Sequence, residues 1–138
     1  MEFRKILTLR GPNIWANHPV LEAWVDLGLF YQQQSQYDKA VSALQSSVEA
    51  NRTKNAALVD AASIYTDMRR QLDVAEQLLR DYLASPAKSD DAPTFKVHQQ
   101  LGDLLKLRGD MAGAHREYEV ATSLASNYGP ARKAVQGA

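Results

Sequence analysis

A pair of small residues recurs at the same spacing in two distant parts of the chain, and this repeat constrains the fold more than any other feature. Ala40 lies twelve positions after Gly28, and Ala114 lies twelve positions after Gly102. Each glycine sits in a frame of larger residues at helical spacing, W-x-x-L-G-x-x-Y in the first case and H-x-x-L-G-x-x-L in the second. Such repetition predicts a fold built from stacked copies of one helical unit.

The small residues mark places where two antiparallel helices are expected to approach closely. Gly28 on one helix would face Ala40 on the next, and Gly102 would face Ala114, while larger neighbours fill the space between hairpins. A looser hairpin around Ala62 would lie between these two. The pattern predicts helices over residues 19–34, 37–50, 55–69, 72–84, 93–108 and 111–126.

Other residues indicate where these helices begin and end. Pro130 predicts a short seventh helix over about 130–137, which would cover the apolar face of the last hairpin because terminal repeats need a cap. Asp110 and Ser35 are expected to be caps or turn residues before the helices that follow them. The polar stretch 85–93 contains two prolines and predicts a lengthened loop.

The frame around Gly28, with 34 residues between Tyr31 and Tyr65, resembles the tetratricopeptide repeat, a helix–turn–helix unit. The resemblance covers residues 21 to about 134. It implies an all-α fold over residues 19–138, a right-handed superhelix of antiparallel hairpins with three repeats and a C-terminal capping helix. It also implies a non-enzymatic protein-interaction scaffold. The repeats would be residues 21–54, 55–88 and 95–128.

In this family the concave face, formed by the first helix of each repeat, usually binds the partner. Here that face would be mildly apolar at one end and of mixed charge at the other. Family members that clamp the C-terminal carboxylate of chaperones use Lys and Asn at several of these positions, which this chain lacks, so a more apolar or extended peptide is expected. The alternative is an ordinary surface in a spacer repeat. The candidate partner-binding residues are Val25, Leu29, Gln32, Val59, Ser63, Thr66, Gln99, Asp103 and Lys106.

Residues 1–18 lack a helical pattern and are predicted to form an extended leader, with a turn at Arg10-Gly11-Pro12-Asn13. The apolar residues of the leader need cover, either in the chain's own groove, on the first repeat or on another copy, so self-association is one option. The stretch L-T-L-R-G-P-N-I-W at residues 7–15 resembles the N-terminus of cyanophycin synthetases. That resemblance implies an alternative function, an accessory protein or fragment related to cyanophycin synthesis.

Composition argues against several other classes of protein. The 16 basic and 16 acidic residues cancel, whereas nucleic-acid and membrane-surface proteins usually carry a basic excess. Without cysteine, a disulfide scaffold and thiolate chemistry are excluded. No apolar run approaches the ~20 residues of a membrane helix, and no export signal is found, so a cytoplasmic location is predicted.

No catalytic, cofactor or metal site is expected from the sequence. The three histidines lack ligand spacing, and the many carboxylates form no acid/base pair with a nucleophile. His98 occupies the position of Trp24 in the repeat and is predicted to pack, whereas His115 is predicted to lie on the surface. The Asn51-Arg52-Thr53 sequon is interpreted as a loop leading into the third helix.

Overall fold

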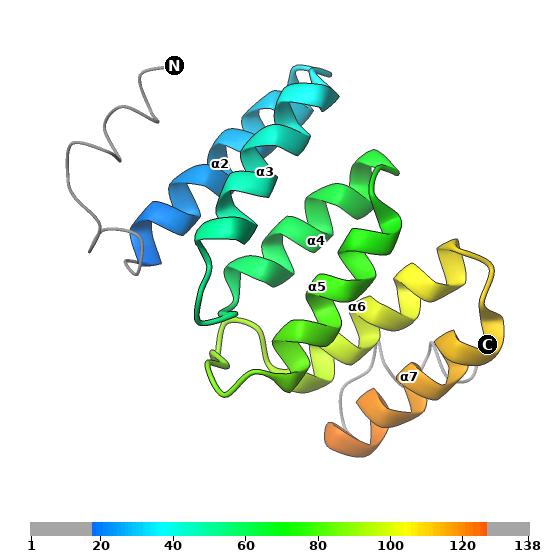
Figure 1. Ribbon diagram of the computed structural model, residues 1–138. Coiled ribbons are helices and arrows are strands. Elements are labelled where there is room, and N and C mark those ends of the chain that lie inside the picture. Colours follow the sequence, from blue (N-terminus) through cyan, green and yellow to red (C-terminus); the bar gives the residue numbers. More distant parts are fainter. Residues whose placement is uncertain (1–17, 127–138) are drawn as a thin grey trace.

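The chain folds as three helical hairpins stacked one after another (Figure 1). The computed structural model describes residues 18–126, so the predicted leader lies almost wholly outside the described residues. Within residues 18–126 there is no strand, and helices pack most extensively within the pairs α2–α3, α4–α5 and α6–α7. The predicted all-α helical-repeat fold is therefore confirmed. The helices are α2 His18–Gln33, α3 Tyr37–Ala50, α4 Ala57–Met68, α5 Leu72–Ala84, α6 Thr94–Leu107 and α7 Met111–Leu124.

A single apolar core runs through all three hairpins. Helix faces with small residues allow the close approach, and Ala40, Ala62 and Ala75 are fully buried. Tyr65 and Tyr82 are among the largest buried side chains, and burial raises the pKa of Tyr65 to about 12. A second, smaller cluster of Val20, Trp24 and Ala43 lies between α2 and α3.

Each glycine lies beneath a larger side chain of the second helix, and Gly28 also approaches the predicted Ala40. A Cβ atom on Gly28 would lie 2.7 Å from Leu44 Cδ2, with the carbonyl oxygen of Ala40 at 3.6 Å. A Cβ atom on Gly102 would lie 2.5 Å from Tyr118 Cε1, and its nearest neighbours all belong to that ring. The side chain nearest to Gly102 is therefore Tyr118, a residue that the sequence did not indicate for this contact. Helical side chains lean toward the N-terminus of their helix, so the larger residue one turn further along α7 covers the glycine.

Left-handed backbone closes each hairpin. Ser35 has φ 60° between α2 and α3, and Gly109 has φ 91° between α6 and α7. The α4–α5 turn uses two such residues, Arg69 at φ 58° and Gln71 at φ 53°. Ser35 is thus a turn residue, one of the two roles expected for it.

The cap predicted at Asp110 is confirmed. Its Oδ1 accepts a hydrogen bond from the backbone N–H of Gly113 at 2.9 Å, which satisfies one of the donors left unpaired at the start of α7. Gln36 holds the equivalent position before α3, and its side chain makes no cap hydrogen bond.

Buried polar side chains hold the junctions between hairpins. Asn51, 1% exposed, directly follows α3, and its Oδ1 accepts a hydrogen bond from the backbone N–H of Asn55 at 3.1 Å. The sequon region forms a loop before α4, as predicted. The loop over 85–93 is likewise confirmed. There the hydroxyl of Tyr82 donates to the Ala92 carbonyl at 2.8 Å and accepts from the Ser89 N–H at 2.8 Å.

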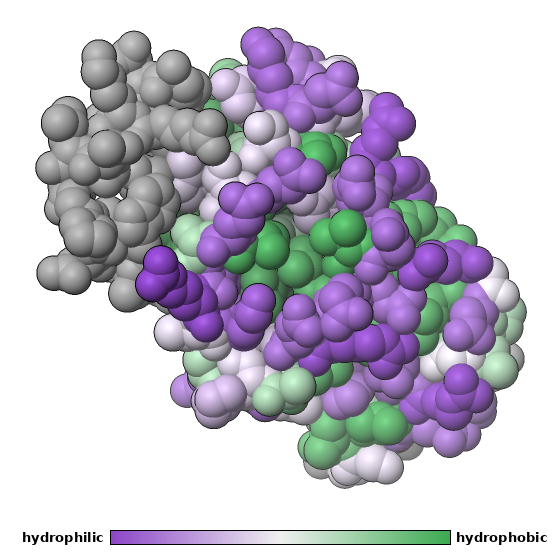
Figure 2. All heavy atoms as spheres, viewed as in Figure 1, coloured by the Kyte–Doolittle hydropathy of each residue, from purple (hydrophilic) through white to green (hydrophobic). Residues whose placement is uncertain are grey.

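The last described helix leaves apolar side chains uncovered. Val120 and Leu124 on α7 are 39% and 55% exposed, and Figure 2 shows hydrophobic surface at the lower end of the molecule, where α7 ends. The seventh helix predicted over 130–137, which would cover the apolar face of this hairpin, lies outside the described residues.

Candidate functional site

The first helices of the three hairpins, α2, α4 and α6, share a face that we call the first-helix face. It is clearest on α4, which contacts α2 and α3 on one side and α5 on another. The exposed residues of α4 are Asp60, Ser63 and Asp67, which follow one another at helical spacing. The side chain of Gln100 on α6 reaches α4, where its Nε2 donates to the Val59 carbonyl at 3.3 Å. The exposed stripe of α4 is therefore the centre of the first-helix face.

Two of the nine predicted partner-binding residues do not reach the surface. Val25 and Val59 are 7% and 8% exposed and belong to the main core. They are buried because the hairpins stack through these positions, so they pack the fold rather than offer contacts to a partner. The remaining seven are exposed or half-buried: Leu29, Gln32, Ser63, Thr66, Gln99, Asp103 and Lys106.

Asp103 is held in place from the second helix of its own hairpin. The hydroxyl of Tyr118 on α7 donates a hydrogen bond to Asp103 Oδ1 at 2.6 Å. Burial, together with this hydrogen bond to a carboxylate, raises the pKa of Tyr118, so the phenol remains a donor. Asp103 thus combines an exposed position on the first-helix face with a fixed orientation.

Sequence reasoning missed two acidic residues on the same helices. Asp26 on α2 and Asp60 on α4 are both exposed and lie 34 residues apart, the period of the repeat. The recurrence of a carboxylate at one repeat position was a signal that could have identified them. With Glu22 and Asp67, which are also exposed, they give the α2–α4 part of the face an acidic character. Of the apolar residues predicted for this end, Val25 and Val59 are buried and contribute no surface, whereas Leu29 is 39% exposed.

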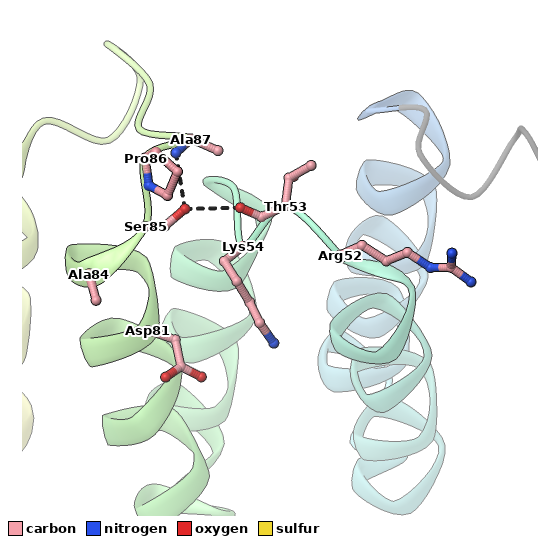
Figure 3. A pocket seen from close by; sticks show the side chains of 8 residues that line it. All are labelled: Arg52, Thr53, Lys54, Asp81, Ala84, Ser85, Pro86 and Ala87. Carbon is pink, nitrogen blue, oxygen red and sulfur yellow. Dashed lines mark hydrogen bonds between the residues drawn. The ribbon is translucent and has the colours of Figure 1, made fainter.

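A pocket of about 630 Å³ lies away from this face, between the α3–α4 turn and the end of α5 (Figure 3). The hydroxyl of Ser85 joins its two walls by donating to the Thr53 carbonyl at 2.9 Å. Arg52 points away from the other lining residues in Figure 3, and the remaining lining includes one basic residue, Lys54, and one acidic residue, Asp81. The pocket therefore presents mixed charge with no convergent set of polar groups.

A second pocket, of about 350 Å³, lies between α2 and α3. Trp24, Leu27 and Tyr31 form its α2 side, and α3 contributes Lys39 and small residues. Its lining belongs mainly to the packing of the first hairpin, since Trp24 is part of the small core cluster there.

His98 and His115 each contact a single carboxylate. His98 Nδ1 lies 2.8 Å from Glu117 Oε1, and His115 Nε2 lies 2.7 Å from Glu119 Oε1. His98 is half-buried as a packing residue should be, but its contact across the hairpin is polar. Among residues 18–126, no group of three or more metal-ligating side chains converges. No helix within the same residues has the length and apolarity to cross a membrane.

Comparison with known proteins supports the repeat interpretation. The tetratricopeptide repeat model matches residues 21–54, the first predicted repeat. A search of curated proteins finds no match. The resemblance of the leader to cyanophycin synthetases is not shown by these comparisons and stays a prediction.

Three solved structures are similar over most of the chain. The N-terminal domain of stress-induced protein-1 (STI-1) from C. elegans has a TM-score of 0.67 at 14% identity, covering 86% of this chain and 94% of that one. The first TPR of Spaghetti (RPAP3) bound to the HSP90 peptide SRMEEVD has a TM-score of 0.68 at 18% identity, covering 90% and 94%. MamA has a TM-score of 0.67 at 19% identity, covering 96% and 70%. At these identities the likeness establishes the fold, a tetratricopeptide-type helical repeat.

Proposed function

We propose that this protein is a non-enzymatic interaction scaffold that binds an extended peptide or a partner subunit on its first-helix face. The observation that carries the proposal is that the same repeat position is exposed on the first helix of each hairpin: Leu29 on α2, Ser63 on α4 and Asp103 on α6. The hairpins beneath them share one buried core, so the three positions are held rigidly relative to one another.

The fold supports this use of the face. Exposed positions on rigid helices offer polar and apolar contacts to a chain lying across them. Because the helices are already rigid, no free energy is lost in ordering the binding face itself. In the Spaghetti structure, a protein of this fold is bound to a peptide. Here the exposed side chains across the three helices include Leu29, Asp67 and Lys106, a set suited to binding and without a nucleophile–base pair.

A bulky residue at the centre of the face should block binding. We expect Ser63→Tyr to weaken binding of peptides selected from a random display library by about tenfold or more, because the exposed serine stands at the middle of the α4 stripe. Isothermal titration calorimetry on the full chain measures the effect, and circular dichroism checks the fold.

Ser123→Tyr is the matched control, since Ser123 is an exposed serine on α7, a second helix. It should leave the affinity unchanged. Selected peptides that bind Ser63→Tyr as tightly as the unmodified chain would place the binding surface elsewhere.

A further inference from the structure

Charge is unevenly distributed over a chain that is neutral as a whole. Helices α2 and α4 carry four acidic residues, and neither contains a lysine or an arginine. The second helices are mixed by comparison, with Lys39 on α3, Arg80 on α5 and Arg116 on α7 beside their carboxylates. The negative charge is thus a property of the first helices of hairpins one and two, not of the whole surface. The four acidic residues are Glu22, Asp26, Asp60 and Asp67.

These carboxylates are spaced to meet an extended chain. Asp60 and Asp67 are seven residues apart on α4, which is about 10 Å along a helix axis. Neighbouring helices lie about 8–10 Å apart, so Asp26 on α2 is separated from the α4 stripe by a similar distance. Leu29 and Phe30, 39% and 52% exposed, add apolar surface at the end of α2. The occupant best matched to this surface is a basic segment that also carries apolar side chains.

The chain itself contains such a segment immediately before α2. Residues 3–15 include three basic residues and no acidic one, in a protein whose total charges cancel. The segment is also rich in large apolar side chains, among them Phe3, Ile6, Leu7, Leu9 and Trp15. Its basic residues are Arg4, Lys5 and Arg10.

The segment is long enough to reach the face within one molecule. Arg4 lies fourteen positions before His18, the first residue of α2, and an extended chain of that length spans up to about 45 Å. Helix α2, with 16 residues, is about 24 Å long. A short tether also gives a high effective concentration, so binding within the molecule prevails over binding between molecules.

We propose that residues 3–15 lie against the α2–α4 part of the first-helix face of their own chain, with basic side chains facing the four carboxylates. The segment then occupies the site of the proposed partner and must be displaced before the partner binds. This inference rests on the proposed function for the competition, but the contact between segment and face can be tested separately.

The first test measures competition in the full chain. The probe is a fluorescein-labelled synthetic peptide with the sequence of residues 2–16, and binding is followed by fluorescence anisotropy. We expect the leader-neutral variant, R4Q/K5Q/R10Q, to bind the probe about tenfold more tightly than the unmodified chain, because its own segment no longer competes. Equal affinities would overturn the proposal.

The second test asks whether the face attracts the segment. Adding D26N/D60N/D67N to the leader-neutral variant should weaken probe binding about tenfold and reduce its salt dependence. The matched control, D38N/E49Q/D73N, removes the same charge from exposed positions on α3 and α5. If the control substitutions weaken probe binding equally, the net charge of the chain, and not the carboxylates of α2 and α4, explains the attraction of the probe. The proposal would then fail.

Other outcomes separate this inference from the proposed function. Library peptides that depend on Ser63 but bind the unmodified and leader-neutral chains equally would leave the scaffold function intact and refute the competition. A probe that depends on the three aspartates while no library peptide binds the face would support the contact and refute the scaffold function. Sedimentation velocity should show a monomer, since a dimer lost in the leader-neutral variant would refute binding within one chain.

Discussion

The first and third hairpins place the same residue type at the same point but oppose it with different chemistry. Gly28 and Gly102 occupy equivalent positions, and the residue that lies over each is Leu44 in one hairpin and Tyr118 in the other. Leu44 is held by apolar packing, whereas the Tyr118 hydroxyl is bonded to Asp103. The repeat therefore specifies a small residue under a large one, and leaves the nature of the large one open.

Polar contacts accumulate in the third hairpin at positions that are apolar or uncapped in the first. His98 pairs with Glu117 where the first hairpin buries Trp24. Asp110 caps α7 where Gln36 makes no cap before α3. Hydrogen bonds fix orientation more narrowly than apolar contacts do, so substitutions in the third hairpin should be tolerated less well.

The largest effect should come from filling the space under the aromatic ring. We expect Gly102→Leu to lower the free energy of unfolding by about 3 kcal/mol, since the side chain would overlap the Tyr118 ring. The ring cannot move aside without breaking its hydrogen bond to Asp103. Urea denaturation followed by circular dichroism measures the loss.

An alanine pair isolates the comparison. Gly102→Ala and Gly28→Ala gain the same helix propensity, about 1 kcal/mol, so the difference between them reports packing alone. We expect Gly102→Ala to be less stable than Gly28→Ala by about 1 kcal/mol. The flexible end of Leu44 can shift to admit a methyl group at position 28, whereas the Tyr118 ring is held by its hydrogen bond to Asp103. Equal stabilities of the two variants would show that the Tyr118 ring yields to a methyl group as easily as the Leu44 side chain does.

The sequence predicted most of the fold because its dominant signals are local. Helix periodicity and turn residues located all six helices seen within residues 18–126 to within two residues at each end. The partner of each glycine could not be read in the same way. Spacing along the chain identifies which helices meet, but the direction in which side chains lean decides that Tyr118, not Ala114, covers Gly102.

The candidate site was predicted less completely, for a related reason. Position within a repeat identifies the side of a helix, but not whether stacking with the next hairpin will bury it. Val25 and Val59 lie on the expected helices and are nevertheless core residues. Asp26 and Asp60 share the period of the repeat. They make the surface acidic only because α2 and α4 contain no lysine or arginine, which is a property of whole helices and not of single residues.

A smaller effect should follow from removing the side-chain cap that α7 has and α3 lacks. We expect Asp110→Ala to cost about 1 kcal/mol, because the backbone N–H of Gly113 would lose its acceptor. Gln36→Ala, at the equivalent position, should change stability by less than about 0.5 kcal/mol. Thermal denaturation of both variants makes the comparison, and a loss of similar size at Gln36 would contradict the difference in capping.

The smallest effect is expected at Ser35, where the first hairpin has serine in a turn that the third hairpin closes with glycine. Ser35 at φ 60° and Gly109 at φ 91° close equivalent turns, and a side chain makes this backbone region unfavourable. We expect Ser35→Gly to stabilise the chain by about 0.5 kcal/mol, because relief of that strain exceeds the added freedom of glycine in the unfolded chain. Gly109→Ser should destabilise it by about 1 kcal/mol, since its φ lies further from the range that serine tolerates. Urea denaturation measures the stability of both variants. If Gly109→Ser left the stability unchanged, the two turns would accept serine equally well, and the argument from backbone conformation would be wrong.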